Sequence, residues 1–563
     1  MTATAAHQHR RELLWFLAIA FVVLAFGIGL RAPWPADEPR FVLVAKQMWE
    51  SGEWLFPHRG QELYPDKPPL YFWLLGAAYA LVRDWNLAFL LPSLLAALGT
   101  LALTYDLGRR LWSPRAGLWA AIGVLVCAQF IHQAKRAQID PTVTFFITLG
   151  VYGLLRHTLL GPQWRWYWLG CFAAGLGVIS KGVGFLALLL LLPYGVMRAR
   201  RWPGLAPLGR GNGGRWALGA LAFLGAIALW LVPMATTALA SDNPEHRAYL
   251  HEILFRQTAT RYTDAWIHHQ PAWYFLEVIA LRWLPFSLAL PWLLPRWREA
   301  LRAREARVWL PLAWALLVVG FFSLSPGKRD MYILPTLPMV ALAAAPYLAG
   351  IAARPWFRRV LAGLFALLAV VLLAAGAAAL GGEPRFELRI EAERGLAPGD
   401  DALWQWLLAT GAAMLLAQLV LYRRALAGAA AAYAVLIVLL YGGVSLLLDD
   451  ENSARAVMQR ARVLAGPRTE LGLVAWKEQN LLQAVGPVAE FGFLRPFPEQ
   501  LAAGIAWLRQ APEHRRLFVL EEALGECVLR ARAQEVGTAN RRTWFLVGPE
   551  AIAPACRPAA TAP

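Results

Sequence analysis

The sequence predicts a mainly α-helical fold, a polytopic membrane bundle of about thirteen transmembrane helices, from three observations. Hydrophobic residues make up 58% of the 563 residues and charged residues only 16%, against roughly 25% in soluble domains. The apolar residues fall in runs of about 16 to 24, long enough to cross a hydrocarbon core of roughly 30 Å. Such runs are helical in lipid, because each backbone N–H and C=O needs a partner within the segment.

The predicted spans follow these apolar runs, beginning with a cytoplasmic N-terminus. They cover residues 13–30, 86–107, 116–133, 141–160, 166–180, 182–197, 215–235, 272–295, 307–324, 331–349, 358–380, 402–421 and 426–448. The first run follows Arg10 and Arg11 and has no clear small-residue cleavage site, so we expect an uncleaved span. The apolar stretch 69–82 is expected to lie as a juxtamembrane helix, because a crossing there would move every later arginine cluster outside.

The net charge of +17 comes from arginines grouped between the apolar runs, which is typical of cytoplasmic loops. The groups are Arg109, Arg110 and Arg115; Arg198, Arg200 and Arg201; Arg296, Arg298, Arg302, Arg304 and Arg307; Arg354, Arg358 and Arg359; and Arg423 and Arg424. A nucleic-acid surface would instead form a contiguous basic stripe on one folded domain. We therefore expect no nucleic-acid partner. The acidic residues gather in the outer segments 31–85 and 236–271 and in the tail after residue 448.

The tail differs in composition from the rest of the chain, which divides it into residues 1–448 and 449–563. Apolar, β-leaning runs at 471–476, 488–493, 516–520 and 543–547 alternate with helical patterns at 454–464 and 499–510. This alternation predicts a small extracytoplasmic α/β domain with a loose tip at 551–563. Cys527 and Cys556 could pair in an oxidising compartment, and the sequence leaves this open.

The first outer segment, 31–85, holds the candidate catalytic carboxylates. Asp37 and Glu38 follow the first span within a few residues, where acidic side chains are costly unless they face water or a partner. Asp37 could equally be the N-cap of a following helix. Further on, Tyr64, Asp66 and Lys67 stand at a proline-rich bend, which places a positive charge at the membrane surface. A snorkelling interfacial lysine is the alternative interpretation of Lys67.

Other polar residues lie at the outer ends of the predicted spans, on the same side of the membrane as the first outer segment. They are Arg40, Asp140, Lys181, Glu252, Arg256, His268, His269, Lys328, Arg329 and Tyr332. Each could be a topological anchor, but one crevice could also collect these carboxylates and cations. Such a crevice suits a reaction with a phosphate leaving group, because Lys and Arg stabilise charge developing on the phosphate. In that reaction, Asp37 would orient an acceptor or act as its base.

Five motifs together carry a family resemblance: Asp37-Glu38-Pro39-Arg40, Asp66-Lys67-Pro68-Pro69-Leu70, Ile139-Asp140-Pro141, Ser180-Lys181-Gly182 and Gly327-Lys328-Arg329-Asp330-Met331-Tyr332. Their order resembles the GT-C superfamily, and more narrowly its dolichyl-phosphate-mannose protein mannosyltransferases and aminoarabinose lipid A transferases. The resemblance implies an inverting transfer of a sugar from a polyprenyl-phosphate carrier. It implies that Asp37 is essential, that Arg40, Tyr64 and Lys67 lie around the donor phosphate, and that Lys181 and Tyr332 lie nearby. Asp140, in the second outer loop, is the third candidate catalytic carboxylate.

The same resemblance gives only weak support for a divalent cation. Asp66 stands where aminoarabinose transferases carry glutamate, and Ile253 is the nearest match to their third-loop histidine. His251, His268 and His269 are close but shifted, and ligation needs further donors in the right geometry. We therefore predict no metal ligands.

Four functions remain open on the sequence. The leading one transfers a sugar to lipid A or another envelope glycolipid at the periplasmic face of a bacterial inner membrane, and the second transfers it to protein Ser/Thr. The α/β tail favours the first. A transporter or flippase would show inverted repeats and polar groups near the membrane midplane, whereas the charges here gather at one face and no repeat is found. A structural or assembly protein would tolerate loss of Asp37 and Lys67.

Overall fold

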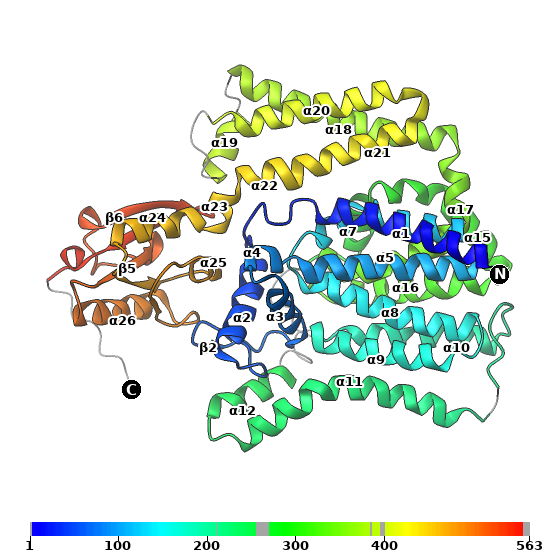
Figure 1. Cartoon of the computed structure of the whole chain (residues 1–563), viewed down its shortest axis with the longest axis horizontal. Coiled ribbons are helices and arrows are strands. Elements are labelled where there is room, and N and C mark those ends of the chain that lie inside the picture. The colour runs from blue at the N-terminus through cyan, green and yellow to red at the C-terminus, as the bar shows by residue number, and fades with distance from the viewer. Residues whose placement is uncertain (1–2, 210, 255–268, 383–384, 395–399, 555–563) are drawn as a thin grey trace.

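The computed structural model describes residues 3–209, 211–254, 269–382, 385–394 and 400–554. Long helices run side by side in a bundle, and a small sheet with its own helices lies at one end of that bundle (Figure 1). The N-terminus and the connection between α10 (Leu191–Ala199) and α11 (Gly213–Ala240) lie at the opposite end. The chain is thus mainly helical, as predicted.

Within the described residues, seven helical segments are long and apolar enough to cross a membrane. They span Trp85–Leu111, Gly213–Ala240, Ala306–Leu324, Asp330–Ala352, Pro355–Gly382, Ala402–Val420 and Tyr422–Leu447. Each overlaps one predicted span. Their helices are α4 and α5 (Trp85–Ala88, Leu91–Leu111), α11, α16 (Ala306–Leu324), η5 and α17 (Asp330–Thr336, Leu337–Ala352), α18 (Pro355–Gly382), α20 (Ala402–Val420) and η6, α21, η7 and α22 (Tyr422–Arg424, Ala425–Val438, Leu439–Gly443, Val444–Leu447).

Two predicted spans, 116–133 and 272–295, are broken rather than continuous, which corrects the prediction. The segments Pro114–Leu125 (α6) and Ala128–Ala134 (α7) meet at a bend of 71°, and Tyr274–Arg282 meets Phe286–Arg302 at 99°. The two breaks bond each other: the Ala128 N–H donates to the Leu284 carbonyl at 2.8 Å, and Trp283 Nε1 donates to Gln129 Oε1 at 2.8 Å. The Ala128 N–H and the Leu284 carbonyl, both at a break, thereby find a partner inside the protein, as a membrane requires.

The four remaining predicted spans correspond to shorter or more polar helices. These are α1 (Ala3–Ala25), α8 (Ile139–Leu159), α9 (Trp164–Lys181), and η1 with α10 (Gly184–Leu190, Leu191–Ala199). Counting each bent pair as one span, the described residues hold up to nine candidate crossings. The structure therefore gives a polytopic helical bundle, and the number thirteen stays a prediction. Helices α8 and α9 pack closely because Gly153 has no Cβ, which would lie 2.2 Å from the Trp166 carbonyl oxygen.

The first outer segment forms a compact layer between the bundle and the sheet (Figure 1). It contains α2 (Glu38–Ser51), the hairpin of β1 (His58–Arg59) and β2 (Glu62–Leu63), and α3 (Leu70–Val82). The aromatic rings of Phe41, Tyr71 and Phe72 pack at its centre. Helix α3 has 13 residues, about 20 Å of helix, which is shorter than the roughly 30 Å hydrocarbon core. It lies at the end of the bundle, where the sequence predicted a juxtamembrane helix.

The tail folds around a five-stranded mixed sheet of order β4-β3-β5-β7-β6. Its strands are β3 (Glu470–Val474), β4 (Val488–Glu490), β5 (Arg515–Leu520), β6 (Gln534–Ala539) and β7 (Arg542–Val547), and its helices are α24 (Arg455–Ala465), α25 (Glu478–Leu482) and α26 (Phe497–Gln510). Strand β3 pairs in parallel with β4 and β5, and β7 pairs antiparallel with β5 and β6. The stacked rings of Phe518 and Trp544 lie in its core. Cys527 is disulfide-bonded, and Cys556, the candidate partner that the sequence left open, lies outside the described residues.

Shorter elements connect these parts. They are α12 (Pro244–His251), α14 (Tyr274–Glu277), η3 (Val278–Arg282), η4 (Phe286–Ala289), α15 (Leu290–Arg302), α19 (Arg385–Arg394), α23 (Asp449–Ser453), η8 (Glu521–Ala523), η9 (Arg530–Arg532) and η10 (Pro549–Ala551). Helices α18, α20 and α21 form a layer at the edge of the bundle (Figure 1). Helix α12 lies beside α2 and α3, at the same end as the sheet.

Candidate active site

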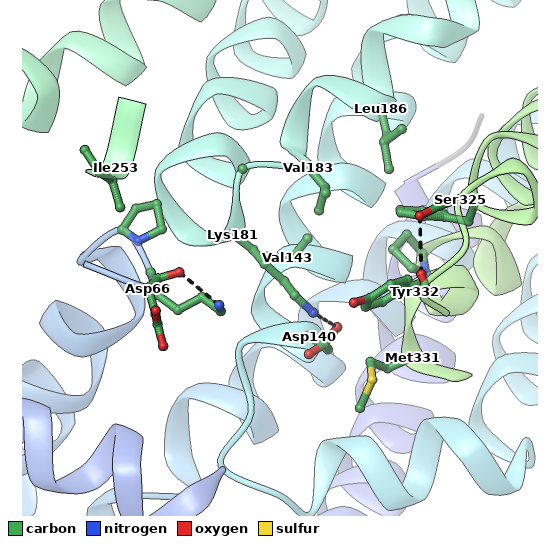
Figure 2. Close-up of a pocket in the computed structure, with 16 residues that line it drawn as sticks. Asp66, Asp140, Val143, Lys181, Val183, Leu186, Ile253, Ser325, Met331 and Tyr332 are labelled. Atoms are coloured by element: carbon green, nitrogen blue, oxygen red, sulfur yellow. Dashed lines mark hydrogen bonds and ion pairs between the residues drawn. The ribbon is translucent and has the colours of Figure 1, made fainter. Parts of the chain in front are cut away.

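A cavity of about 140 Å³ opens at the end of the bundle that faces the tail. Charged and polar side chains line one part of it, and apolar side chains line another (Figure 2). The polar wall includes Asp66, Lys67, Asp140, Lys181 and Tyr332. The apolar wall includes Val143, Val183, Leu186, Phe322 and Pro335. Five residues from four separate motifs of the sequence therefore lie in one wall.

The polar wall is built by elements that are distant in the chain. Asp140 stands in the first turn of α8, Lys181 in the last turn of α9, and Tyr332 in η5. Lys181 forms an ion pair with Asp140, and its ammonium lies 5.3 Å from the centre of the Tyr332 ring. Lys67 Nζ donates to the backbone carbonyl of Asp66 at 2.9 Å. Two lysines thus line a cavity whose other wall is apolar.

Asp37 lies beside this cavity, one residue before α2, and is held by three side chains. Its Oδ2 accepts from Arg329 at 3.0 Å and from Gln138 Nε2 at 3.3 Å, and Arg40 lies 3.8 Å from Oδ1. Asp37 occupies the N-cap position of α2, as the alternative interpretation placed it, but its side chain makes no cap bond to the helix. Burial acts to raise the pKa of Asp37, but Arg329, Arg40 and Lys181 outweigh it and hold the pKa below its usual value. The side chain is therefore a carboxylate at neutral pH.

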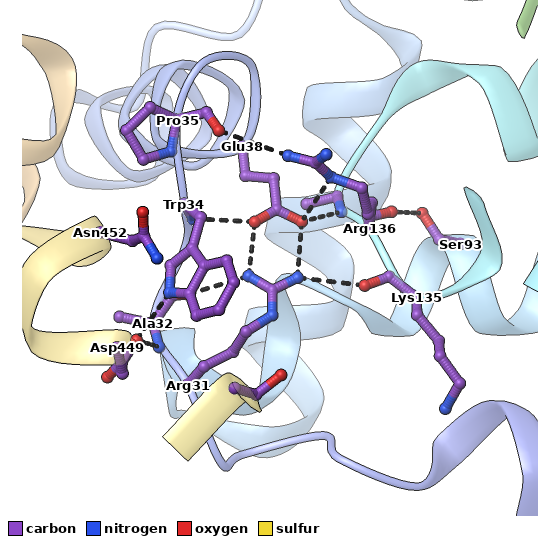
Figure 3. A network of polar contacts seen from close by, with 12 residues as sticks. Arg31, Ala32, Trp34, Pro35, Glu38, Ser93, Lys135, Arg136, Asp449 and Asn452 are labelled. Atoms are coloured by element: carbon purple, nitrogen blue, oxygen red, sulfur yellow. Dashed lines mark hydrogen bonds and ion pairs between the residues drawn. The ribbon is translucent and has the colours of Figure 1, made fainter. Parts of the chain in front are cut away.

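Glu38 has a different setting from its neighbour Asp37 and does not line the cavity (Figure 3). Its carboxylate is fully buried and accepts two bonds from Arg31, at 2.5 and 2.8 Å. The backbone N–H groups of Trp34 and Ala137 also donate to it, at 2.8 and 2.9 Å. Glu38 was a catalytic candidate in the sequence. That role stays a prediction, and the structure shows the carboxylate engaged in joining the first outer segment to the bundle.

The same network reaches the start of the tail. The Ala32 N–H and Trp34 Nε1 both donate to Asp449 Oδ1, at 2.9 and 2.8 Å, and Asp449 also pairs with Arg455 at 3.2 Å (Figure 3). Asp449 begins α23, which follows the last span. The two ends of the membrane bundle are therefore tied together through the residues that precede Asp37.

A second cavity, of about 1070 Å³, lies between the first outer segment, α12 and the tail. Four predicted site residues line it: Arg40, Tyr64, Asp66 and Glu252. Asp66 lines both cavities, so they meet at this residue. Burial, together with the charge of Asp66, raises the pKa of the Tyr64 hydroxyl, which is therefore neutral at physiological pH.

The tail docks directly on the first outer segment. The Gln61 N–H donates to Glu490 Oε1 at 2.7 Å, and the Leu494 N–H donates to the Glu62 carboxylate at 3.1 Å. The Arg59 guanidinium lies 3.9 Å from the centre of the Phe493 ring. The end of β4, the connection that follows it and one residue of α26 thus form one wall of the larger cavity.

The other predicted residues are less central. Lys328 is buried, and its Nζ donates to the Gln270 carbonyl at 2.9 Å. His269 is exposed and forms a β-bridge with Gly327. These contacts join two outer connections of the chain. Neither Lys328 nor His269 lines the smaller cavity, whereas Gly327 does. Arg256 and His268 lie outside the described residues.

A divalent cation does not fit the donors around the smaller cavity. Among the residues that the structure describes, no group of three His, Cys, Asp or Glu side chains could hold a metal ion. Ile253 lines the cavity together with Asp66, and an isoleucine offers no ligand atom. We derive no step through a metal.

Some residues of this region gave no signal in the sequence. Glu478 and Glu490 contact the first outer segment from the tail, across more than 400 residues of chain. Arg31 could be seen as a cation at the end of the first apolar run, but its partner could not. The sequence did not predict the apolar wall of the smaller cavity, because its residues have the hydrophobic pattern of ordinary transmembrane helices.

The fold and these cavities define a multi-pass membrane protein with a charged cavity at one end of its helices and an α/β module over it. Residues 66–206 match the family of dolichyl-phosphate-mannose-protein mannosyltransferases. The chain is 31% identical over 341 residues to the undecaprenyl phosphate-alpha-4-amino-4-deoxy-L-arabinose arabinosyl transferase of Pseudomonas aeruginosa strain LESB58, covering 57% of this chain and 58% of that protein. A relative of the same name from Pseudomonas fluorescens strain Pf0-1 is 32% identical over 344 residues, covering 58% and 56%. The chain therefore matches under three fifths of the length of these relatives.

The fold is that of a solved membrane protein. The crystal structure of ArnT from Cupriavidus metallidurans bound to undecaprenyl phosphate superposes with a TM-score of 0.69 at 19% identity, covering 98% of this chain and 100% of that one. Its structure in the apo state gives the same TM-score, 0.69, at 20% identity over 97% and 99%. The resemblance to GT-C membrane proteins of the aminoarabinose transferase and protein mannosyltransferase type is thus confirmed.

Proposed function

We propose that this protein is a glycosyltransferase that moves a sugar from a polyprenyl-phosphate donor to lipid A or another envelope glycolipid. The observation that carries the proposal is the smaller cavity, which combines Lys67 and Lys181 with an apolar wall beside the ion-paired Asp37. A lipid phosphate has the same two parts, an anionic head and a hydrocarbon chain. The relatives from Pseudomonas are named for an undecaprenyl-phosphate sugar, which supports a donor of this class.

Binding of the donor phosphate would compete with contacts inside the protein. Lys181 now pairs with Asp140, and a phosphate would draw its ammonium away. Lys67 stands at the proline bend that begins α3, and because it lines the same cavity as Lys181 it would give the leaving group a second cation. Both ammonium groups stabilise the charge that grows on the phosphate as the sugar departs.

The transfer is one displacement at the anomeric carbon. An oxygen of the acceptor forms the new bond to this carbon while the bond to the donor phosphate oxygen breaks, and the electron pair leaves with the polyprenyl phosphate. Asp37 has a lowered pKa and is a poor proton acceptor, because an effective base has a pKa near the working pH. We assign it to holding Arg40, Arg329 and the acceptor in place. A phosphate oxygen as acceptor releases no proton, and the proton of a hydroxyl acceptor passes to solvent.

The volume of the larger cavity, about 1070 Å³, supports a bulky acceptor. Among the described residues, three arginines and five carboxylates line it, namely Arg40, Arg59, Arg495, Glu62, Asp66, Glu245, Glu252 and Glu490, and it meets the smaller cavity at Asp66. A phosphorylated glycolipid head could reach the donor from there. Transfer to protein Ser/Thr is the second candidate, favoured by the match of residues 66–206 to the protein mannosyltransferase family.

The orientation belongs to the same proposal. We infer a bacterial inner-membrane protein of about thirteen crossings, with a periplasmic site, a membrane domain over 1–448 and a periplasmic domain over 449–563. The arginine clusters of the inner connections support this orientation.

The test uses the purified full-length protein in lipid nanodiscs with undecaprenyl-phosphate-linked aminoarabinose and lipid A. We expect transfer by wild type, and a loss of roughly 100-fold or more with Lys67→Ala or Lys181→Ala, the size seen when one charge-stabilising donor is removed. Lys46→Ala is the matched control, because Lys46 pairs only weakly with Glu50 at 3.9 Å on α2. Transfer to a Ser/Thr peptide instead of lipid A would favour the second candidate. Full activity of both lysine variants would contradict this site.

A further inference from the structure

We propose that Glu478, a carboxylate of the tail, is a positioning residue for the transfer reaction and acts through Arg40. The tail would then complete the active site rather than only cover it. The inference rests on the proposed function and adds a residue to its site.

Glu478 reaches into the first outer segment from the start of α25. Its Oε1 lies 2.8 Å from Arg40 Nε and 3.6 Å from an amino nitrogen of Arg59. Only 7% of the Glu478 side chain is exposed, so water screens these pairs little. The carboxylate is therefore the common partner of two guanidinium groups.

Arg40 in turn faces Asp37, which links the tail to the reacting site. Its amino nitrogen lies 3.8 Å from Asp37 Oδ1, while Arg329 holds Oδ2 at 3.0 Å. The guanidinium group is planar and its N–H donors have fixed directions. A bond at Nε therefore sets the plane of the whole group and the direction of the nitrogen that faces Asp37.

Four charged side chains form a row that leads from the tail to the site, and their charges alternate in sign. This order determines how the loss of one charge affects its neighbours. Glu478, Arg40, Asp37 and Arg329 follow each other as anion, cation, anion and cation. Without the Glu478 charge, Arg40 and Arg59 would lose the anion between them and repel each other. Arg40 would then turn or move, and Asp37 would lose one of its two fixed cations.

General docking of the tail does not explain this contact. The bonds from Gln61 to Glu490 and from Leu494 to Glu62 already join the tail to the β1–β2 hairpin without Arg40. Glu478 adds a buried ion pair directed at a residue that faces Asp37. This allows the positioning role to be separated from docking by experiment.

The test is a double-mutant cycle on the full chain in nanodiscs, with undecaprenyl-phosphate-linked aminoarabinose and lipid A as substrates. We expect Glu478→Gln to lower kcat by roughly 10- to 100-fold, as a displacement near 1 Å can do, with a smaller change in the KM for the donor. In an Arg40→Ala background the same substitution should change kcat by no more than about twofold, because coupled residues are not additive. Glu478→Asp, which keeps the charge, should regain part of the activity.

Controls separate this role from folding and docking. Glu470→Gln alters a tail carboxylate that pairs with Arg515 at 3.1 Å, contacts no residue of the site, and should leave kcat unchanged. The effect of Glu490→Gln on kcat should multiply with that of Arg40→Ala, because the Glu490 carboxylate bonds Gln61, Trp476 and Gly492 and is not part of the row that joins Glu478 to Asp37. A wild-type kcat in Glu478→Gln would overturn the inference. So would a double variant whose loss of kcat equals the product of the losses of Glu478→Gln and Arg40→Ala. No transfer by wild type would overturn the proposed function and this inference with it.

Discussion

Asp37 and Glu38 are neighbours in the chain, but their surroundings give them different roles. Glu38 is fully buried and takes bonds from Arg31 and two backbone N–H groups. Asp37 keeps 15% of its side chain exposed and faces Arg329 and Arg40. The sequence could mark the pair as candidates, because acidic residues near a membrane boundary are rare. The sequence could not distinguish the roles of Asp37 and Glu38, because Glu38 meets partners such as Ala137 only in the folded chain.

Glu38→Gln should therefore act on stability more than on chemistry. Breaking a buried ion pair by removing one partner costs about 3–5 kcal/mol, so the thermal midpoint should fall well below that of wild type. Asp37→Asn should lower the midpoint by less than Glu38→Gln does and should lose activity by roughly 100- to 1000-fold. Differential scanning of both variants in nanodiscs, beside the transfer assay, checks this. Loss of activity with an unchanged midpoint in Glu38→Gln would instead support Glu38 as a catalytic residue.

The lowered pKa of Asp37 has a consequence for stability with a definite sign. Its folded pKa lies below the unfolded value, so its contribution is complete above the unfolded value, about 3.9 for aspartate, and is lost as pH falls through the folded pKa. The difference in midpoint between wild type and Asp37→Asn should stay constant from pH 7 to 5. It should shrink only below about pH 4. A difference that fades between pH 7 and 5.5 would mean a raised pKa.

The broken helices are the main lesson at the scale of elements. Length and hydropathy predicted continuous spans at 116–133 and 272–295, whereas the structure bends them by 71° and 99°. The bends are supported by contacts between the two segments, at Ala128 and Leu284 and at Gln129 and Trp283. Hydropathy does not report such contacts, because it counts residues along one segment only.

Trp283→Phe tests this pairing. It would remove the donor to Gln129 Oε1 and leave a buried amide without that partner, which costs about 1–3 kcal/mol. We expect a lower thermal midpoint. Trp15→Phe, at a side chain with 63% exposure on α1, is the control and should change little. Equal midpoints for both variants would show that the bond does not support the break.

At the scale of the whole molecule, sequence and structure agree on a polytopic bundle with an α/β module at one end (Figure 1). Strands β3, β4, β5 and β7 lie within or beside the apolar runs predicted at 471–476, 488–493, 516–520 and 543–547. Strand β6 was missed, because Gln534–Ala539 carries polar residues at an edge of the sheet. The docking of this module on the first outer segment depends on contacts distant in the chain.

The proposed orientation can be tested by reporter fusions in cells. A reporter fused after Arg201 should read as cytoplasmic, and one after Gly382 as periplasmic, because arginine-rich connections are retained inside. A cysteine at position 84, after α3, should react with an impermeant reagent added from outside. Labelling there only from the cytoplasm would mean that α3 crosses the membrane and would reverse the later connections.

The most direct test of the central claim is mass spectrometry of lipid A and envelope proteins from cells that express wild type, Asp37→Asn or an empty vector. We expect a sugar-mass adduct on lipid A with wild type only. An Asp37-dependent adduct on peptides would move the protein to the protein-glycosylating branch. No Asp37-dependent adduct on either, in cells that make the polyprenyl-phosphate sugar, would contradict the claim that this cavity transfers a sugar.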